Sequence, residues 1–131
     1  MKFLIDTTVL INAAKNKDEA VKFLSLLPKI TTSGVCACEL LQGAGSKREQ
    51  KTILSFLNSA SIIEVEEKIC EFARELIIKY SLSHGMLILD ALIAATAVKR
   101  NFILVTDNVK HFKFISELTV IKPNEAINKL S

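Results

Sequence analysis

The chain has 131 residues, of which 50% are apolar and 24% charged, a composition typical of one globular domain rather than of a disordered or coiled-coil chain. The uncharged runs 81–89 and 91–98 are separated by Asp90 and fall short of the ~20 residues that a membrane span requires. The formal net charge of +3 is too small to identify a partner by itself.

Two further features predict a cytoplasmic location. The apolar run at the N-terminus is interrupted by Asp6, and no small-residue cleavage site of a signal peptide follows it. The three cysteines, Cys36, Cys38 and Cys70, are odd in number and have neither the C-x-x-C spacing of a redox motif nor a usual zinc spacing. We expect them to be buried and reduced, as thiols are in the cytoplasm.

Along the chain, short apolar runs that are mostly rich in β-branched residues alternate with longer runs of helical periodicity, clearest over 66–80. In chain order, the pattern predicts a strand at 2–5, helices at 9–14 and 18–27, a strand at 30–33, helices at 35–43 and 47–59, a strand at 61–65, helices at 66–80 and 87–100, strands at 102–106 and 119–122, and a helix at 123–130. We therefore expect a single α/β domain over 1–131, an α/β/α sandwich whose short, mainly parallel central sheet of about five strands is flanked by helices.

Two of these predicted strands run into an aspartate. Asp6 follows the first strand, and Asp107 follows the fourth. Parallel strands end at the same edge of a sheet, where the sites of α/β proteins form, so we expect both carboxylates there. Further hydroxyl and amide groups at this edge would come from Thr7, Thr8 and Asn108. The alternative is that each aspartate only caps the helix that follows it.

Two other acidic residues stand alone in apolar segments. Asp90 is the only charged residue in 81–98, where the helical pattern is apolar nearly all round and predicts a buried helix. A buried carboxylate is strongly unfavourable unless it is paired, protonated or bound to a cation. Glu39 is likewise the only charged residue in 31–42, although an exposed glutamate on a half-buried helix is the alternative there.

If Asp6, Glu39, Asp90 and Asp107 meet, their mutual repulsion destabilises the fold unless a cation compensates. Carboxylate oxygens suit Mg²⁺ or Mn²⁺ rather than zinc, and the chemistry that follows is metal-assisted hydrolysis of a phosphodiester. Setting these four aside leaves ten of the 14 acidic residues against 17 basic ones. A polyanionic substrate would then meet a mostly basic surface around an acidic site.

The segments that carry these carboxylates resemble a known family. LIDTTVLI, the glutamate of ACELLQG, HGMLILDALIAATAV and LVTDNVKHF are similar, in this order, to the four acidic motifs of the PIN-domain ribonucleases, particularly the VapC-like toxins of type II toxin–antitoxin pairs. The resemblance spans almost the whole chain, and the DALIAATA stretch is its most specific part. It implies a PIN-like fold and a Mg²⁺- or Mn²⁺-dependent endoribonuclease that acts on RNA in the cytoplasm.

Carried over position by position, the resemblance implies a metal-binding and catalytic quartet with supporting neighbours. The quartet is Asp6, Glu39, Asp90 and Asp107, and the supporting residues are Thr7, Thr106 and Asn108. The resemblance also implies a toxin that is often a homodimer and is neutralised by an antitoxin protein.

Two positions depart from the family pattern. Thr8 stands where asparagine is usual after the first aspartate, which is expected to loosen a hydrogen bond behind the site. His111 stands where many relatives have another aspartate before the phenylalanine, which puts more weight on Asp107 as the fourth ligand.

Several residues other than the proposed site residues have more than one interpretation. His84 and His111 are either acid–base groups or ordinary loop histidines. Basic side chains near the motifs either hold RNA phosphates or lie on solvated helix faces: Lys15, Lys17, Lys47, Arg48, Lys51, Lys110 and Lys113. Apolar faces within 18–27 and 47–59 form a groove for an antitoxin helix, a dimer contact or part of the core: Ala20, Phe23, Leu24 and Leu27, and Ile53, Leu54 and Leu57.

Three other functions share part of this pattern. A phosphoacceptor receiver domain has a similar size and a Lys-Pro step like Lys122-Pro123, but it requires an acidic pair after the first strand, where Asp6 stands alone. A haloacid-dehalogenase-like phosphatase requires a second aspartate at the position of Thr8. A PIN fold without catalysis, serving as an RNA-binding or scaffolding protein, stays open, and substitution of Asp90 separates it from an enzyme.

Overall fold

The computed structural model describes all 131 residues. Its elements, in chain order, are β1 (Phe3–Ile5), α1 (Thr7–Ala14), α2 (Asp18–Ser25), β2 (Thr31–Ser33), α3 (Gly34–Gln42), α4 (Lys47–Ser59), β3 (Ser61–Ile63), α5 (Glu67–His84), α6 (Ile88–Lys99), β4 (Ile103–Val105), the 3₁₀ helix η1 (Val109–His111), β5 (Val120–Ile121) and α7 (Pro123–Leu130). Every predicted strand and helix is present, and η1 is the one element that the pattern did not predict.

The longest helix, α5, continues four residues past its predicted end at Tyr80. It stops at Gly85, which has the left-handed conformation (φ 64°) that a glycine adopts readily after a helix. The final turn contains Leu82, which is apolar but 99% exposed and therefore does not face the core. For this reason the periodicity of the sequence ends before the helix does.

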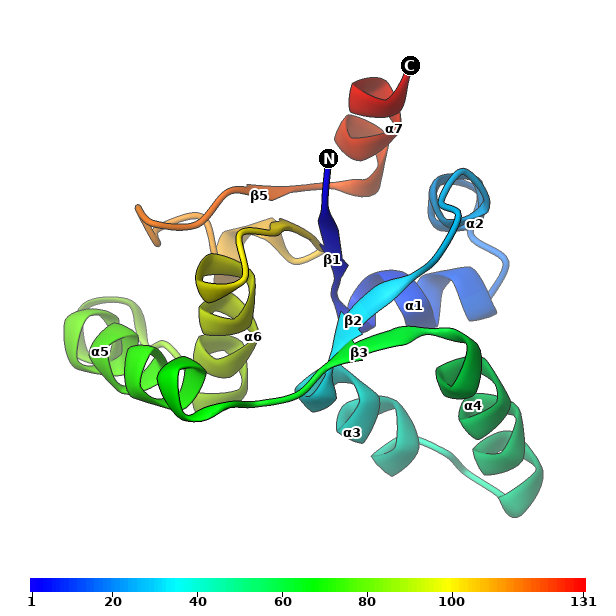
Figure 1. Cartoon of the computed structure of the whole chain (residues 1–131), viewed down its shortest axis with the longest axis horizontal. Helices are drawn as coiled ribbons and strands as arrows, with labels where there is room; N and C mark the ends of the chain where they lie inside the picture. Colours follow the sequence, from blue (N-terminus) through cyan, green and yellow to red (C-terminus); the bar gives the residue numbers. More distant parts are fainter.

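The five strands form two parallel groups rather than the single sheet of about five strands that we expected. The first group has the order β1-β4-β5, and the second pairs β2 with β3. β2 packs beside β1 (Figure 1), but no backbone ladder joins the two strands. The hydroxyl of Thr32 instead donates to the carbonyl of Ile5 at 2.7 Å. The central sheet therefore has three strands.

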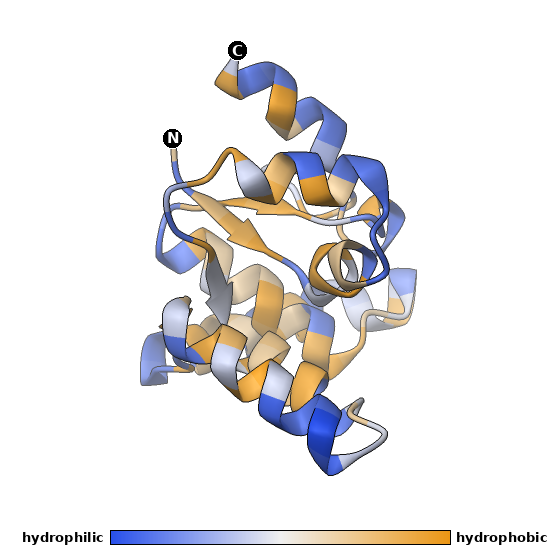
Figure 2. Ribbon diagram, turned by 90° about the vertical axis from the view of Figure 1, so that its right-hand side faces the viewer, coloured by the Kyte–Doolittle hydropathy of each residue, from blue (hydrophilic) through white to orange (hydrophobic).

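Helices cover both faces of the three-stranded sheet, as predicted. Leu4 belongs to a core cluster shared with α5 and α6, whereas its neighbours Phe3 and Ile5 pack in a second cluster with α1, α2 and α7. Leu104 and Val105 divide between the clusters in the same way, because successive strand residues point to opposite faces. Figure 2 shows apolar residues along the strands and on the inner sides of the surrounding helices.

The fold also bears on two expectations drawn from the sequence, one about membrane-spanning helices and one about the cysteines. None of the seven α-helices combines the length and hydropathy that crossing a membrane requires. All three cysteines are free, but only Cys36 is buried, while Cys38 and Cys70 are exposed, so the expectation of three buried thiols was wrong for two of them.

Candidate active site

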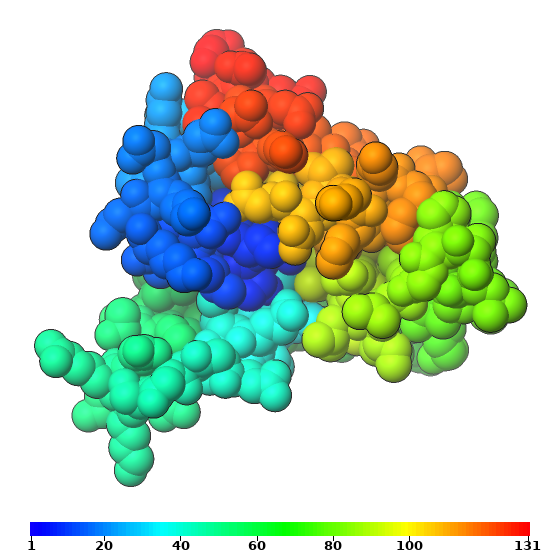
Figure 3. Space-filling view, turned by 180° about the vertical axis from the view of Figure 1, so that it is seen from behind, coloured from blue at the N-terminus to red at the C-terminus, as the bar shows by residue number.

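A cleft of about 460 Å³ opens where β1 and β4 end. Four segments contribute to it: the start of α1, the helix α3, the start of α6, and the stretch that contains η1. In Figure 3 these segments, coloured blue, cyan, yellow-green and orange, meet on one face of the molecule. The lining residues are Asp6, Thr7, Thr8, Glu39, Met86, Leu87, Ile88, Leu89, Asp90, Ile93, Asn108, His111 and Phe112.

Asp6 lies at the base of the cleft with only 5% of its surface exposed. It occupies the N-cap position of α1, yet its side chain makes no capping hydrogen bond. Its Oδ2 instead accepts hydrogen bonds from the hydroxyls of Thr8 (2.9 Å) and Thr106 (2.7 Å). The alternative of a simple helix cap therefore does not describe this carboxylate.

Glu39 reaches the cleft from α3, which begins directly after β2. The helix starts where the side chain of Ser33 accepts a hydrogen bond from the backbone N–H of Cys36 at 3.0 Å. Glu39 is half-buried, and its Oε1 accepts a hydrogen bond of 2.7 Å from the hydroxyl of Thr7. Ligand atoms of Asp6, Glu39 and Cys36 all lie within 4.8 Å of one another.

The thiol of Cys36 is fully buried beside Asp6, with its Sγ 3.9 Å from Asp6 Oδ1. Burial raises the pKa of this thiol, and the negative charge of Asp6 raises it further. The thiol is therefore kept protonated, with its weak donor directed at Asp6. Sequence reasoning did not find this neighbour, because nothing in the spacing of the cysteines points to Asp6.

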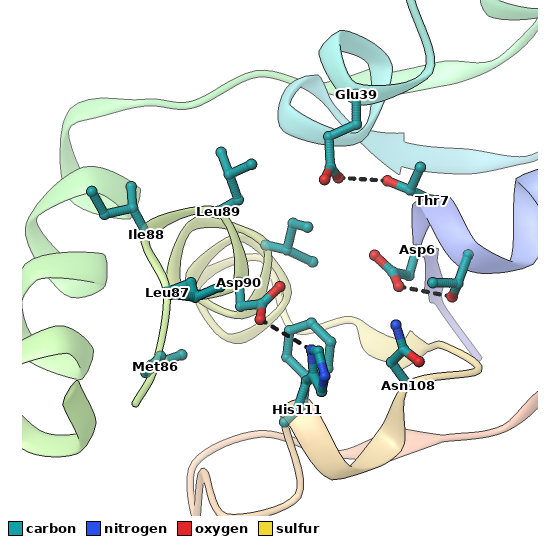
Figure 4. Close-up of a pocket in the computed structure, with 13 residues that line it drawn as sticks. Asp6, Thr7, Glu39, Met86, Leu87, Ile88, Leu89, Asp90, Asn108 and His111 are labelled. Atoms are coloured by element: carbon teal, nitrogen blue, oxygen red, sulfur yellow. Dashed lines mark hydrogen bonds and ion pairs between the residues drawn. The ribbon is translucent and has the colours of Figure 1, made fainter. Parts of the chain in front are cut away.

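Asp90 lies in the first turn of α6, opposite Asp6 and Glu39 (Figure 4). We expected it within a helix buried nearly all round. Residues 91–97 of α6 are almost entirely buried, but Leu87, Ile88 and Leu89 before them are exposed, so Asp90 faces the cleft. A helix N-terminus stabilises a negative charge at this position.

The pKa of Asp90 is raised, chiefly by burial. His111 opposes this shift, since its Nδ1 lies 3.4 Å from Asp90 Oδ2. The negative charge of Asp6 raises the pKa of Asp90 further. The histidine at the departure from the family pattern thus contacts one of the predicted site carboxylates. The other departure, Thr8, retains a direct hydrogen-bond donor to Asp6 rather than loosening the site.

Asp107, the fourth predicted carboxylate, does not line the cleft. Its Oδ2 accepts a hydrogen bond of 2.6 Å from Asn12 Nδ2, which directs the side chain toward α1. Asn108 lines the cleft in its place, and its backbone N–H donates to Thr106 Oγ1 at 3.0 Å. Asp107 lies in a bend directly after Thr106, whose hydroxyl donates to Asp6. This bend, which no pattern in the sequence indicated, leaves Asn108 rather than Asp107 on the side of the cleft.

Each of the three carboxylates in the cleft has one oxygen that a hydroxyl or imidazole group contacts and a second oxygen that no such group contacts. Thr8 and Thr106 hold Oδ2 of Asp6, Thr7 holds Oε1 of Glu39, and His111 lies against Oδ2 of Asp90. The remaining oxygens have no nitrogen or oxygen donor and belong to side chains that point toward a common space (Figure 4). Hard oxygen donors of this kind fit a Mg²⁺ or Mn²⁺ ion.

Comparison with known proteins identifies relatives along almost the whole chain. The sequence profile of the PIN domain family matches residues 3–117. Ribonuclease VapC2 of Rickettsia felis is 32% identical over 129 residues, which cover 90% of this chain and 95% of the relative. A solved structure of VapBC2 from Rickettsia felis, bound to a DNA fragment from their promoter, aligns with a TM-score of 0.79 at 30% identity over 93% of this chain and 98% of that one. A toxin–antitoxin complex from Klebsiella pneumoniae aligns with a TM-score of 0.77 at 28% identity over 92% and 96% of the two chains.

Proposed function

This chain belongs to the PIN domain family, and on that premise we propose that it is a Mg²⁺- or Mn²⁺-dependent endoribonuclease, the toxin of a type II toxin–antitoxin pair. The observation that carries the proposal is the arrangement of Asp6, Glu39 and Asp90 around a single cleft, each with one oxygen that no nitrogen or oxygen donor contacts. Relatives that are named ribonuclease VapC support RNA as the substrate. The test is cleavage of RNA by the purified protein with magnesium, with manganese and with a chelator.

In this proposal Asp6, Glu39 and Asp90 hold the metal, and Asp107 acts from behind the site. A bound Mg²⁺ or Mn²⁺ supplies positive charge that stabilises the transition state of phosphodiester hydrolysis. The hydroxyls of Thr7, Thr8 and Thr106 fix their carboxylates before substrate binds, so little reorganisation is needed. Asp107 contributes by orienting Asn12, while its backbone N–H donates to Thr8 Oγ1.

The proposed antitoxin occupies an apolar groove between α1 and α4. Two adjoining hollows of about 610 and 340 Å³ share Leu10, Leu40 and Ile53, and the larger one reaches Glu39 of the cleft. An apolar groove of this kind suits the apolar face of an amphipathic helix, and Lys15 and Arg48 at its edge suit acidic side chains. Of the apolar faces noted in the sequence, Leu24 and Ile53 line this groove, while Ala20, Phe23 and Leu57 are buried.

Expression of the chain in a bacterial host is expected to stop growth, and co-expression of the antitoxin encoded beside its gene to restore it. Ile11→Asp places a charge at the edge of the groove and should weaken neutralisation at least tenfold while RNA cleavage is retained. Growth at titrated antitoxin levels measures the effect. Val21→Asp is the matched control, since Val21 is equally exposed on α2 but lies outside the groove. Equal neutralisation of both variants would argue against the groove.

We also propose that the protein is a homodimer that uses the outer face of α5. Ile78 and Leu82 lie one helical turn apart there and are 80% and 99% exposed. Neighbouring apolar side chains that are this exposed are unusual in a monomer. Leu82→Lys is expected to convert dimer to monomer in sedimentation velocity measurements, whereas Leu26→Lys, at another exposed leucine, should not. A wild-type protein that sediments as a monomer at high concentration would contradict this proposal.

A cytoplasmic location follows from the proposed substrate and partner. RNA and a newly made antitoxin are both met in the cytoplasm. The three free thiols fit the reducing conditions of that compartment.

A further inference from the structure

A side pocket of about 150 Å³ adjoins the cleft on the side of α5. It shares Met86, Leu87, Asp90 and His111 with the cleft, so the two hollows are continuous enough for one ligand to occupy both. The lining residues that it does not share with the cleft are His84, Gly85, Lys110 and Phe114. The pocket shares no residue with the proposed antitoxin groove, and Asp90 is the one proposed metal ligand that lines it.

One wall of the pocket is a stack of rings. The imidazole of His84 lies parallel to the ring of Phe114, with centroids 4.4 Å apart and an interplanar angle of 12°. The ring of Tyr80 meets both edge-on, at 5.1 Å from Phe114 and 5.8 Å from His84. Ser83 Oγ lies 2.8 Å from His84 Nδ1 and fixes the ring orientation. The wall therefore ends in the flat imidazole of His84, which is exposed to solvent.

The other groups around the pocket complement this flat wall. Gly85 turns the chain in a left-handed conformation, so that Met86 and Leu87 supply apolar surface directly after the ring of His84. Lys110 supplies an exposed positive charge from η1. A stacking surface, apolar neighbours and one cation are the groups with which proteins hold an unpaired base of single-stranded RNA and its phosphate.

We propose that this pocket holds one unpaired nucleobase of the RNA, stacked against His84 beside the phosphodiester in the cleft, with Lys110 on a neighbouring phosphate. The inference rests on the proposed ribonuclease function and adds a base subsite to it. The proposed dimer contact does not compete for the pocket. Leu82 and His84 are two residues apart, which on a helix places them about 200° apart, on opposite sides of α5.

The test uses a fluorescein-labelled single-stranded RNA of mixed sequence, bound by the full-length protein in a chelator so that no cleavage occurs. Anisotropy is expected to show that His84→Ala weakens binding at least fivefold, as loss of a stacked base does, while His84→Phe stays within about twofold of wild type. Lys110→Gln should reduce the slope of log Kd against log salt by about one, and Lys129→Gln, on the distant α7, should leave it unchanged.

A second measurement locates the base. Abasic substitutions are introduced one at a time along a cleavable RNA, and each is cut in Mg²⁺ by wild type and by His84→Ala. An abasic substitution at one position next to the cleaved bond should weaken RNA binding by wild type but not by His84→Ala. For wild type, this substitution should change the KM more than the kcat. If wild type cuts RNA and His84→Ala binds and cuts it equally well, the subsite is wrong and the nuclease stands. If wild type neither binds nor cuts RNA, both proposals fail.

Discussion

Asp90→Asn is expected to abolish RNA cleavage and to leave the fold at least as stable as wild type in metal-free buffer. Changes to groups that only support a metal ligand already cost about 10- to 100-fold, so loss of a proposed ligand should lower kcat by more than about 100-fold. The substitution keeps the shape of the side chain and removes its charge. Cleavage assays in Mg²⁺ and thermal unfolding in chelator measure the two effects.

The expected gain in stability has a definite dependence on pH. Because burial raises the pKa of Asp90 in the folded state, the unfolded chain ionises first as the pH rises above the ordinary aspartate pKa of about 3.9. Ionisation then favours unfolding, and the free energy of unfolding stops falling once the pH exceeds the raised pKa. Asp90→Asn should therefore be more stable than wild type at pH 7, and the difference should disappear near pH 3.

Glu71→Gln is the matched control, because Glu71 is an exposed carboxylate on α5 outside the cleft. It should change neither cleavage nor the pH dependence of unfolding. Full activity of Asp90→Asn would remove Asp90 from the mechanism. Normal RNA binding by a wild-type protein that never cleaves would instead favour a PIN fold without catalysis.

Removal of divalent metal is the second large effect that we expect. A chelator should abolish cleavage, and Mg²⁺ or Mn²⁺ should restore it. A ligand that binds only the folded state, at about 100 times its Kd, stabilises that state by about 2.7 kcal/mol. For a domain of this size the melting temperature should then rise by roughly 10 °C.

The same titration in variants shows where the metal binds. Asp6→Asn and Asp90→Asn should each lose most of the rise in melting temperature, whereas Asp107→Asn should keep most of it, because the carboxylate of Asp107 is held by Asn12 outside the cleft. Cleavage that persists in excess chelator would contradict the metal proposal. Loss of the shift in Asp107→Asn would restore Asp107 as a direct ligand.

The parts of the fold and site that could be predicted from sequence depend on local patterns. Asp6 was predicted because it directly follows a strand, and Asp90 and Glu39 because each is alone in an apolar segment. The placement of Asp107 depends on the bend after β4 and on its hydrogen bond with Asn12, which joins residues 95 apart in sequence. The division of the sheet into three and two strands depends on the Thr32 contact with Ile5, which joins residues 27 apart in sequence. The proposed base pocket depends on the stacking of His84 on Phe114, which are far apart in sequence, and on the turn at Gly85, which places Met86 and Leu87 beside them.

The divided sheet also determines how the site is held together. Asp6 follows β1 of the three-stranded sheet, whereas Glu39 lies on the helix that follows β2 of the two-stranded pair. Their spacing is therefore set across a boundary spanned by two hydroxyl contacts, Thr32 to Ile5 and Thr7 to Glu39, each 2.7 Å long. A cation bound by both carboxylates would act as a cross-link between the two halves of the domain. Opening of this boundary, measured by hydrogen exchange of the β2 and β3 amides, should slow when metal is added, whether or not RNA is present.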